Sequence, residues 1–312
     1  MKAVLPALAR PLLEPHLPSD LEVAWFSTPA EANAAVADAE IAWVDMQPTA
    51  LVADAIRHGG PRLRWVSTIY AGLDAFPLDR LRGDGVVVTN GVGINAVAVA
   101  EYAVLGVLAA AKRFDRVVDA QGRREWLRDA PGKVELFGTR ALIVGYGAIG
   151  RLVGERLRAF GVEVAGVTRS GSDGTLTPDH WRARLPEFDW IVLAAPSTPE
   201  TKAMIGPAEL AAMKPGAWLV NVARGDMVDQ AALLDALRSG GIAGAFLDPT
   251  EPEPLPPDHP LWTAPNCMVS MHLSGRSTTR MFERAAALFL DNLRAFRDGR
   301  PMRNVADLDA GY

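Results

Sequence analysis

The chain has little cysteine and no excess of basic residues. Cys267 is the only cysteine in 312 residues, so no disulfide can form within the chain, which favours the reducing cytoplasm as its location. The 32 lysines and arginines are outnumbered by 37 aspartates and glutamates, which gives a formal net charge of −5. Binding to nucleic acid or to an anionic membrane is therefore not expected, because either would require a basic face. A small anionic substrate would need only local arginines.

The sequence also lacks a hydrophobic run long enough to cross a bilayer. The longest apolar segment, residues 96–111, contains Glu101 and is shorter than a membrane-spanning helix requires, so we expect a buried helix. At the start of the chain, Pro6 and Arg10 interrupt the apolar residues too early for a secretory signal, and a first strand is expected there instead. With no low-complexity tract, the length favours a soluble protein of two globular domains.

What the sequence does contain is an alternation of short apolar strands with helices. Strands are expected at residues 2–8, 21–26, 41–44, 63–69, 86–89, 141–144, 162–167, 189–194, 217–222, 243–248 and 268–272. Helices are expected at residues 29–39, 49–58, 96–114, 207–213, 229–239 and 278–298. Short parallel strands with helical crossovers predict an α/β fold of two Rossmann- or flavodoxin-like, doubly wound parallel-sheet domains with a cleft between them.

The two long helices set the predicted domain boundaries. The helix at 96–114 leads into the second domain, and the helix at 278–298 is long enough to return to the first. We therefore expect a discontinuous substrate domain, residues 1–95 and 278–312, and a dinucleotide-binding domain, residues 96–277. Residues 248–262 are too rich in proline for regular structure, and a structureless segment of this length is usually functional.

A glycine-rich turn, GYGAIG at residues 145–150, joins a predicted strand to an amphipathic helix. Gly145 would allow the sharp bend, Gly147 would let the backbone approach a pyrophosphate, and Gly150 would let the helix pack on its strand. The N–H groups at the start of the helix would face the phosphate charge. Glycines at this spacing also occur in ordinary turns, but the flanking strand and helix favour a dinucleotide site formed by Gly145, Tyr146, Gly147, Ala148, Ile149 and Gly150.

The residues after the next strand indicate which dinucleotide is bound. An NAD-binding unit usually ends this strand in an acid that holds the ribose 2′-hydroxyl, but here the residues are Thr168, Arg169 and Ser170. They offer a guanidinium and two hydroxyls to a 2′-phosphate and no carboxylate to repel it. NADPH is therefore predicted over NADH, although Arg169 could also be an ordinary surface arginine.

Three polar residues are expected just beyond the carboxyl ends of predicted strands, where open α/β sheets bind their ligands. They are Arg224 in NVARG, Glu253 in the proline-rich segment and His272 in SMHLSG. Each alone has an ordinary explanation: an arginine that holds a loop, a solvated acid, or a structural histidine at a strand end. Together they provide an anion clamp, a titratable group and a carboxylate that orients it, which indicates catalysis.

With these residues in view, the sequence resembles the D-isomer-specific 2-hydroxyacid dehydrogenases, especially their glyoxylate and hydroxypyruvate reductase branch. AGLD at residues 71–74 is similar to the family's substrate-carboxylate loop, and NAVAVAEYAVLGVL is similar to its crossover helix. The motifs that follow in the family's order and spacing are VGYGAIG, PSTPETKAMI, NVARGDMVDQAALLDAL, GAFLD, EPEPLPPDHPLW and HLSG. The resemblance covers nearly the whole chain.

The resemblance implies a role for each matching residue. Arg224 would bind the keto-acid carboxylate and polarise the carbonyl, His272 would donate a proton to the carbonyl oxygen, and Glu253 would hold that proton on the histidine. The substrate carboxylate would be bound by the loop of Ala71, Gly72 and Leu73 through backbone N–H groups. Asp248 would bond the nicotinamide carboxamide, and no metal is expected. The cofactor-binding residues implied beyond the glycine turn and residues 168–170 are Ala195, Pro196, Val222, Ala223, Arg224, Asp248 and His272.

Three positions differ from the family's usual residues. Met271 stands where a proline usually precedes the histidine, which could shift the imidazole or loosen its loop. Tyr70 stands where the substrate loop usually has a small residue, so its ring could crowd or line the pocket. Pro249 and Thr250 replace a valine and an aromatic residue, which could change the path of the loop that carries Glu253. None of these changes removes a reacting group.

The activity implied is NADPH-dependent reduction of glyoxylate, hydroxypyruvate or a similar small 2-keto acid to the D-2-hydroxy acid, by a homodimer formed through the dinucleotide-binding domain. A bulkier keto acid stays open, since pocket width depends on Tyr70, Met46, Gln47 and Trp126. A second alternative is a corepressor-like protein that senses the dinucleotide, although we expect no appended disordered tail that would carry motifs for binding partner proteins. Formate or phosphite as donor is less expected, because the 115–137 connection is short and no N-terminal extension is expected.

Overall fold

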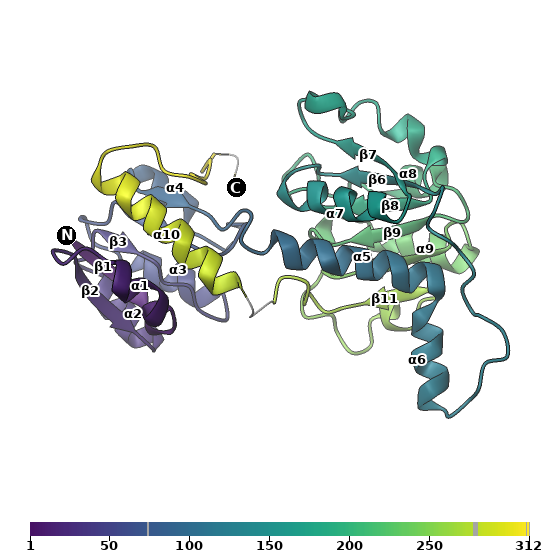
Figure 1. Ribbon diagram of the computed structural model, residues 1–312, viewed down its shortest axis with the longest axis horizontal. Helices are drawn as coiled ribbons and strands as arrows, with labels where there is room; N and C mark the ends of the chain where they lie inside the picture. Colours follow the sequence, from purple (N-terminus) through teal and green to yellow (C-terminus); the bar gives the residue numbers. More distant parts are fainter. Residues whose placement is uncertain (74, 277–279, 310, 312) are drawn as a thin grey trace. The chain divides into compact units, whose positions relative to one another are not determined.

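The computed structural model describes residues 1–73, 75–276, 280–309 and 311, so Asp74 of the predicted substrate loop and Thr278, the predicted start of the last helix, lie outside it. The chain divides into two compact units, Met1–Asn95 with Ser277–Tyr312 and Ala96–Arg276 (Figure 1). Each contains a parallel sheet, and the predicted doubly wound α/β class is confirmed. In the part of the chain described, no helix is both long and apolar enough to cross a membrane.

The first unit is built on a sheet of five strands in the order β2-β1-β3-β4-β5, and every neighbouring pair is parallel. The strands are β1 (Lys2–Pro6), β2 (Glu22–Phe26), β3 (Ile41–Ala42), β4 (Trp65–Ser67) and β5 (Val87–Thr89). Alternate residues of β1 enter opposite cores, because Val4 packs on one face and Ala3 and Leu5 on the other. The helices on the first face are α2 (Pro29–Val36), α3 (Ala50–Arg57) and α4 (Leu78–Gly83), and those on the second are α1 (Arg10–Leu13) and α10 (Met281–Arg297).

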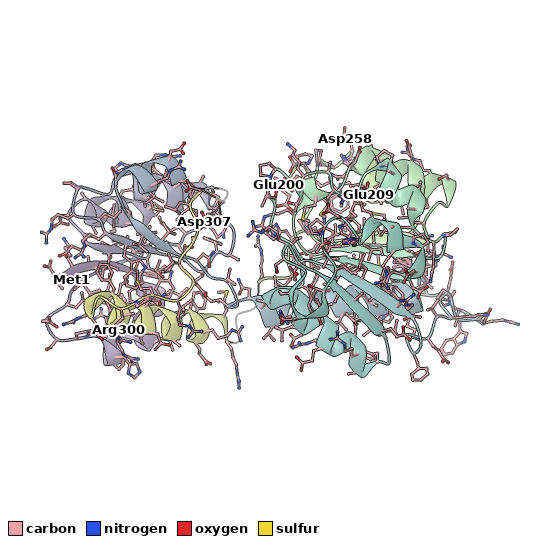
Figure 2. All side chains as sticks on the ribbon, turned by 90° about the horizontal axis from the view of Figure 1, so that it is seen from above. Met1, Glu200, Glu209, Asp258, Arg300 and Asp307 are labelled. Atoms are coloured by element: carbon pink, nitrogen blue, oxygen red, sulfur yellow. The ribbon has the colours of Figure 1, made fainter. Side chains whose placement is uncertain are left out.

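The second unit is built on a parallel sheet of six strands in the order β11-β10-β9-β8-β6-β7. The strands are β6 (Arg140–Val144), β7 (Glu163–Val167), β8 (Trp190–Leu193), β9 (Trp218–Asn221), β10 (Gly244–Leu247) and β11 (Cys267–Val269). The helices α5 (Ala96–Lys112) and α7 (Ala148–Ala159) cover one face, and α8 (Pro207–Ala212) and α9 (Gln230–Ser239) cover the other. Both faces of each sheet are buried under helices, which explains why the strands read as continuous apolar runs. Figure 2 draws the side chains of both units.

Short-range signals in the sequence fix where individual helices begin and end. Thr28 and Glu31 form a capping box at the start of α2, where the Glu31 N–H donates to the Thr28 hydroxyl at 3.3 Å and the Thr28 N–H donates to the Glu31 carboxylate at 3.1 Å. Asp229 caps α9 by accepting from the N–H of Ala232 at 3.0 Å. That helix ends at Gly240, whose φ of 71° is left-handed.

The structure corrects several of the predicted elements. β1 ends at Pro6, and a 3₁₀ turn (Ala7–Ala9) replaces its predicted continuation to residue 8. The helix predicted over 96–114 is two helices, because Arg113 adopts a left-handed conformation with φ of 49° and α6 (Phe114–Gly122) starts after it. β11 ends at Val269, and two residues of the predicted strand, Met271 and His272, lie in a turn instead. The proline-rich segment contains a 3₁₀ turn (Pro260–Thr263), where the proline stands in a first-turn position that needs no N–H donor.

Candidate active site

The site residues predicted in the second unit all follow the carboxyl ends of its strands. Because the strands are parallel neighbours, these ends lie along one edge of the sheet. Gly145 follows β6, residues 168–170 follow β7, Ala195 and Pro196 follow β8, residues 222–224 follow β9, Asp248 follows β10, and His272 follows β11. The chain reverses its winding direction between β6 and β8, which is where sheets of this type bind ligands.

The glycine turn after β6 is held against the end of β8. Gly145 has φ of 94°, and a Cβ on it would lie 2.3 Å from the backbone nitrogen of Ala195, so no other residue fits there. A Cβ on Gly150 would lie 2.2 Å from the Gly145 carbonyl oxygen, which shows how closely α7 packs on the turn. A Cβ on Gly147 would meet nothing within 4 Å. Open space at Gly147, next to the first N–H groups of α7, fits the pyrophosphate of a dinucleotide.

The loop after β7 is closed by its own hydroxyl groups. The Thr168 and Thr175 hydroxyls are 2.6 Å apart, and the Thr168 oxygen accepts from the N–H of Gly171 at 3.1 Å. Arg169 and Ser170 are exposed on this loop. The pKa of Glu200 is lowered, first by the Thr198 hydroxyl and also by the positive charge of Arg169. An exposed guanidinium and hydroxyl at the end of β7 fit a ribose 2′-phosphate.

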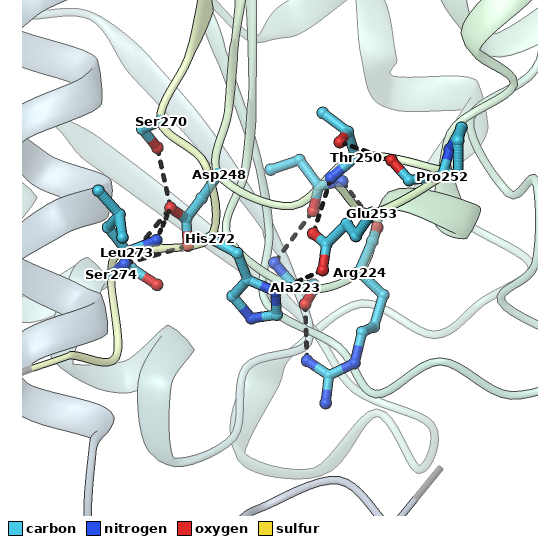
Figure 3. Close-up of polar contacts among 11 residues, drawn as sticks. Ala223, Arg224, Asp248, Thr250, Pro252, Glu253, Ser270, His272, Leu273 and Ser274 are labelled. Carbon is cyan, nitrogen blue, oxygen red and sulfur yellow. Dashed lines mark hydrogen bonds and ion pairs between the residues drawn. The ribbon is translucent and has the colours of Figure 1, made fainter. Parts of the chain in front are cut away.

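His272 and Glu253 form a pair at this edge. The Nδ1 atom of His272 lies 2.9 Å from Oε2 of Glu253, and the side chains are 44% and 39% exposed (Figure 3). Oε1 of Glu253 accepts from the N–H of Thr250 at 3.1 Å, so each carboxylate oxygen has a donor. Because the pair occupies Nδ1, Nε2 is the ring nitrogen that can face a substrate.

The carboxyl group of Glu253 is kept ionised by its surroundings. Burial raises its pKa, but the hydrogen bond and positive charge of His272, the Thr250 N–H and the charge of Arg224 act in the opposite direction. The result is a pKa below the ordinary value for glutamate. The carboxylate therefore stays negative into acidic solution and can hold a proton on the facing imidazole.

The turn that carries His272 is organised by Asp248. The Asp248 side chain is 1% exposed and accepts from the Ser270 hydroxyl at 2.8 Å and from the backbone N–H groups of Leu273 at 2.9 Å and Ser274 at 3.3 Å (Figure 3). Its backbone oxygen accepts from the N–H of His272 at 2.8 Å. These contacts could not be predicted from the sequence, because they depend on β10 and β11 lying side by side.

Arg224 lies in a turn that is pressed against the proline-rich loop. Its Nη1 donates to the Ala223 carbonyl at 2.9 Å, and Asn221, which is 1% exposed, donates to the Arg224 carbonyl at 2.8 Å. A Cβ on Gly225 would lie 2.1 Å from the carbonyl carbon of Thr250, so glycine is required for this close approach. Asn221 and Gly225 therefore position the site, although the sequence showed them only as letters of the NVARG motif.

The three departures from the family have definite positions. Met271 and His272 have φ of 58° and 54°, a left-handed conformation that the proline usual at position 271 could not adopt, since its ring holds φ near −65°. The Thr250 hydroxyl donates to the Pro252 carbonyl at 3.1 Å, next to the N–H that Thr250 donates to Glu253. The Tyr70 hydroxyl donates to the Met46 carbonyl at 2.9 Å and accepts from Gln47 at 2.7 Å, which fixes its ring.

The predicted carboxylate loop belongs to the first unit. Ala71 is exposed, Gly72 is half-buried, and Leu73 is fully buried in the core formed with α2, α3 and α4. Trp126, predicted as a possible pocket residue, belongs to the second unit and is 93% exposed. Within the described ranges, no three His, Cys, Asp or Glu side chains gather as metal ligands.

Comparison with known proteins identifies the family. The model of the "D-isomer specific 2-hydroxyacid dehydrogenase, NAD binding domain" matches residues 104–274. The glyoxylate reductase of Korarchaeum cryptofilum is 35% identical over 266 residues, which cover 80% of this chain and 78% of that protein. The chain belongs to the D-isomer-specific 2-hydroxyacid dehydrogenase family. The resemblance found in the sequence is therefore confirmed.

Other members of the 2-hydroxyacid dehydrogenase family differ in length and name. The D-3-phosphoglycerate dehydrogenase of Methanocaldococcus jannaschii is 30% identical over 295 residues, and this chain spans only 56% of its length. A solved structure, the NADPH-dependent glyoxylate/hydroxypyruvate reductase of Sinorhizobium meliloti in complex with NADP and malonate, has a TM-score of 0.77 and 26% identity. That alignment covers 99% of this chain and 98% of the other.

Proposed function

We propose that this 2-hydroxyacid dehydrogenase reduces a small 2-keto acid such as glyoxylate or hydroxypyruvate to the D-2-hydroxy acid, with NADPH as the electron donor. The observation that carries the proposal is the His272–Glu253 pair, 2.9 Å apart and close enough to Arg224 for its charge to lower the Glu253 pKa. This group follows strands of the same sheet as the glycine turn. The glyoxylate reductase relative at 35% identity supports the substrate class.

The proposed mechanism gives each side chain one task. Arg224 binds the keto-acid carboxylate through its planar fork and polarises the carbonyl oxygen. His272 donates the proton on Nε2 to that oxygen, while Glu253 stabilises the charged imidazole and holds it in orientation. When bound, NADPH would supply the hydride for the carbonyl carbon. In the first unit, the N–H groups of Gly72 and Leu73, with Ala71, are assigned to the substrate carboxylate.

The preference for NADPH is proposed from the loop after β7. Arg169 and Ser170 are exposed, and no carboxylate lies among residues 168–170. Arg169→Ala should raise KM for NADPH about tenfold or more and leave KM for NADH nearly unchanged, because only NADPH carries the 2′-phosphate. Arg238→Ala, which removes an exposed arginine of α9, is the matched control. A wild-type preference for NADH would overturn this part of the proposal.

The decisive experiment measures initial rates of NAD(P)H oxidation with glyoxylate, hydroxypyruvate and phenylpyruvate, each with NADPH and with NADH. Turnover of the small acids that disappears in His272→Ala supports the proposal. Oxidation of D-3-phosphoglycerate is tested as well, because two relatives named D-3-phosphoglycerate dehydrogenase are 30% and 34% identical to this chain. Tight cofactor binding without turnover of any acid would instead favour the dinucleotide-sensing alternative.

We also propose that the protein is a homodimer formed through its second unit. Large apolar side chains are exposed along α6 and the residues after it, and Figure 1 shows this helix extending away from the rest of the unit. They are Phe114 (56% exposed), Val118 (52%), Trp126 (93%) and Phe137 (81%). Sedimentation equilibrium of the Trp126→Ser, Phe137→Ser double variant should show weaker association. Leu8→Ser, at a residue 70% exposed in the first unit, is the control.

A further inference from the structure

Asp45 is an acidic side chain of the first unit that none of the roles above uses. It follows β3 and is partly buried. Its Oδ1 accepts from the Thr68 hydroxyl at 2.6 Å, and its Oδ2 accepts from the Ile69 N–H at 2.6 Å and the Trp43 indole N–H at 2.7 Å. Two of these donors belong to the residues that follow β4, the next strand of the sheet.

The contacts of Asp45 continue toward the carboxylate loop. The Thr68 hydroxyl, which donates to Asp45, accepts from the N–H of Tyr70 at 3.1 Å. Tyr70 is joined to the residues after Asp45 a second time, through the contacts of its hydroxyl with Met46 and Gln47. Residues 68–70 are therefore held to the segment after β3 by both backbone and side chain, immediately before residues 71–73.

The end of β5 holds the same segment from its other side. The N–H of Thr68 donates to the Thr89 carbonyl at 3.0 Å, and the N–H of Gly91 donates to the Tyr70 carbonyl at 2.8 Å. The Asn90 amide donates to the Ala71 carbonyl at 3.3 Å. Because β4 lies between β3 and β5, Asp45 supplies the anchor on one side and residues 89–91 supply it on the other.

The environment of Asp45 is costly for a carboxylate. Removal from water raises the pKa of Asp45 to about 6, although the donors on Thr68, Ile69 and Trp43 favour the charged form. An asparagine would retain an acceptor for Ile69 and Trp43, and the Thr68 hydroxyl could turn to accept from its amide. Replacing Asp45 with asparagine therefore tests the charge of this side chain separately from its shape.

We propose that Asp45 is a positioning residue for the substrate carboxylate: it fixes residues 68–70, and thereby sets the directions of the Gly72 and Leu73 N–H groups and of the Tyr70 ring. The inference rests on the proposed function, in which those N–H groups bind the keto acid. In this role Asp45 acts on substrate binding, whereas the proposed proton-transfer residues, His272 and Glu253, belong to the other unit.

The kinetic test compares Asp45→Ala, Asp45→Asn and Thr68→Val with wild type. Asp45→Ala should raise KM for glyoxylate about tenfold and change kcat less than about twofold, because a lost bond to a charged group is worth about 1.5 kcal/mol or more. Asp45→Asn should restore most of the wild-type KM, and Thr68→Val should fall between. The matched control is Asp54→Asn, which changes an acid of α3 that accepts from Asn33 at 2.9 Å. Equal KM values in wild type and Asp45→Ala would overturn the inference.

The second readout does not require turnover. Hydrogen–deuterium exchange of the peptide that covers residues 68–73 should be faster in Asp45→Ala than in wild type, with α10 unchanged as a check that the unit is folded. Unchanged exchange of that peptide would overturn the inference even in an active enzyme. If the wild type reduces no keto acid, the proposed function fails, and the enzymatic role of Asp45 fails with it, whatever the exchange shows.

Discussion

Replacing Glu253 with glutamine removes one negative charge beside His272 and keeps the shape of the side chain. The amide oxygen can still accept from the Thr250 N–H, which now donates to Glu253 at 3.1 Å. The amide nitrogen would face Nδ1 of His272, where the carboxylate oxygen now lies at 2.9 Å. The variant therefore tests the charge of Glu253 separately from its place in the loop.

The size of the effect follows from the distance and exposure of the pair. Two unit charges about 4 Å apart interact by about 1 kcal/mol in water and about 4 kcal/mol at the effective dielectric near a protein surface. The side chains are 44% and 39% exposed, so solvent screening places the net value near the lower limit, at about 1–2 kcal/mol. At a pH where His272 must hold its proton, that is a loss of about 5- to 30-fold in kcat/KM.

The assay is the pH dependence of kcat/KM for keto-acid reduction. Reduction consumes a proton, so its rate should fall as pH rises. The wild-type carboxylate favours a proton on the facing imidazole, and its lowered pKa keeps it charged into acidic solution. Glu253→Gln should therefore lose kcat/KM relative to wild type as pH rises, and the difference from wild type should shrink in acidic buffer.

The control is Glu251→Gln, which removes the same charge from a neighbouring exposed side chain of the same loop. It should leave the pH profile unchanged. A Glu253→Gln profile that is lower by the same factor at every pH would refute the reasoning, since it would mean that Glu253 acts through the loop structure alone. A profile equal to wild type would refute it as well.

Three further predictions follow from single positions. Arg224→Lys should lower kcat/KM by about 100-fold, because an ammonium cannot bind two oxygens as a planar fork does; near-normal turnover would contradict the assigned role. Met271→Pro should lower kcat at least about tenfold, because proline cannot adopt φ of 58°, whereas Met271→Gly should stay close to wild type in the same assay. Asp45 has a folded pKa of about 6 against an ordinary 3.8, so the folded state binds the extra proton, and stability should fall as pH rises from about 4 to 6. Thermal unfolding of wild type should therefore lose up to about 3 kcal/mol relative to Asp45→Asn across that window, and a constant difference would contradict this.

The fold class was predictable because the strands are buried on both faces. Parallel strands covered by helices appear as continuous apolar segments, and those segments are unmistakable at β6 and β8. The break between α5 and α6 was not predictable, because Arg113 carries the left-handed φ with no glycine or asparagine to signal it. The Arg113–Asp115 ion pair at 2.8 Å, with side chains 14% and 28% exposed, stabilises the break and is visible only in the structure.

The part of the candidate site that does not depend on the order of the strands in the sheet could be predicted from the sequence. Polar residues after apolar runs mark the edge of a parallel sheet, which is why Arg224, Glu253 and His272 could be selected together. The lateral order of the strands cannot be read from the chain, because β8 pairs with both β6 and β9. Contacts between loops of neighbouring strands therefore remained hidden, and these include every contact of the Asp248 side chain with residues 270–274.

The two units use the same arrangement to hold the loop that follows a neighbouring strand. In the second unit, Asp248 follows β10 and accepts a hydroxyl and backbone N–H groups from the turn after β11. In the first unit, Asp45 follows β3 and accepts a hydroxyl and a backbone N–H from the segment after β4. A carboxylate suits this position because its two oxygens can accept several hydrogen bonds at once. It can therefore orient several N–H and O–H groups of a neighbouring loop.

The two aspartates should nevertheless differ in their kinetic effect, because the loops that they hold carry different groups. Asp248 orders the turn of His272, which transfers the proton in the proposed mechanism, so its loss acts on kcat. Asp45 orders the segment before Gly72 and Leu73, which bind the carboxylate in the proposed mechanism, so its loss acts on KM. The same chemical device thus has different consequences because the loops it holds carry different groups.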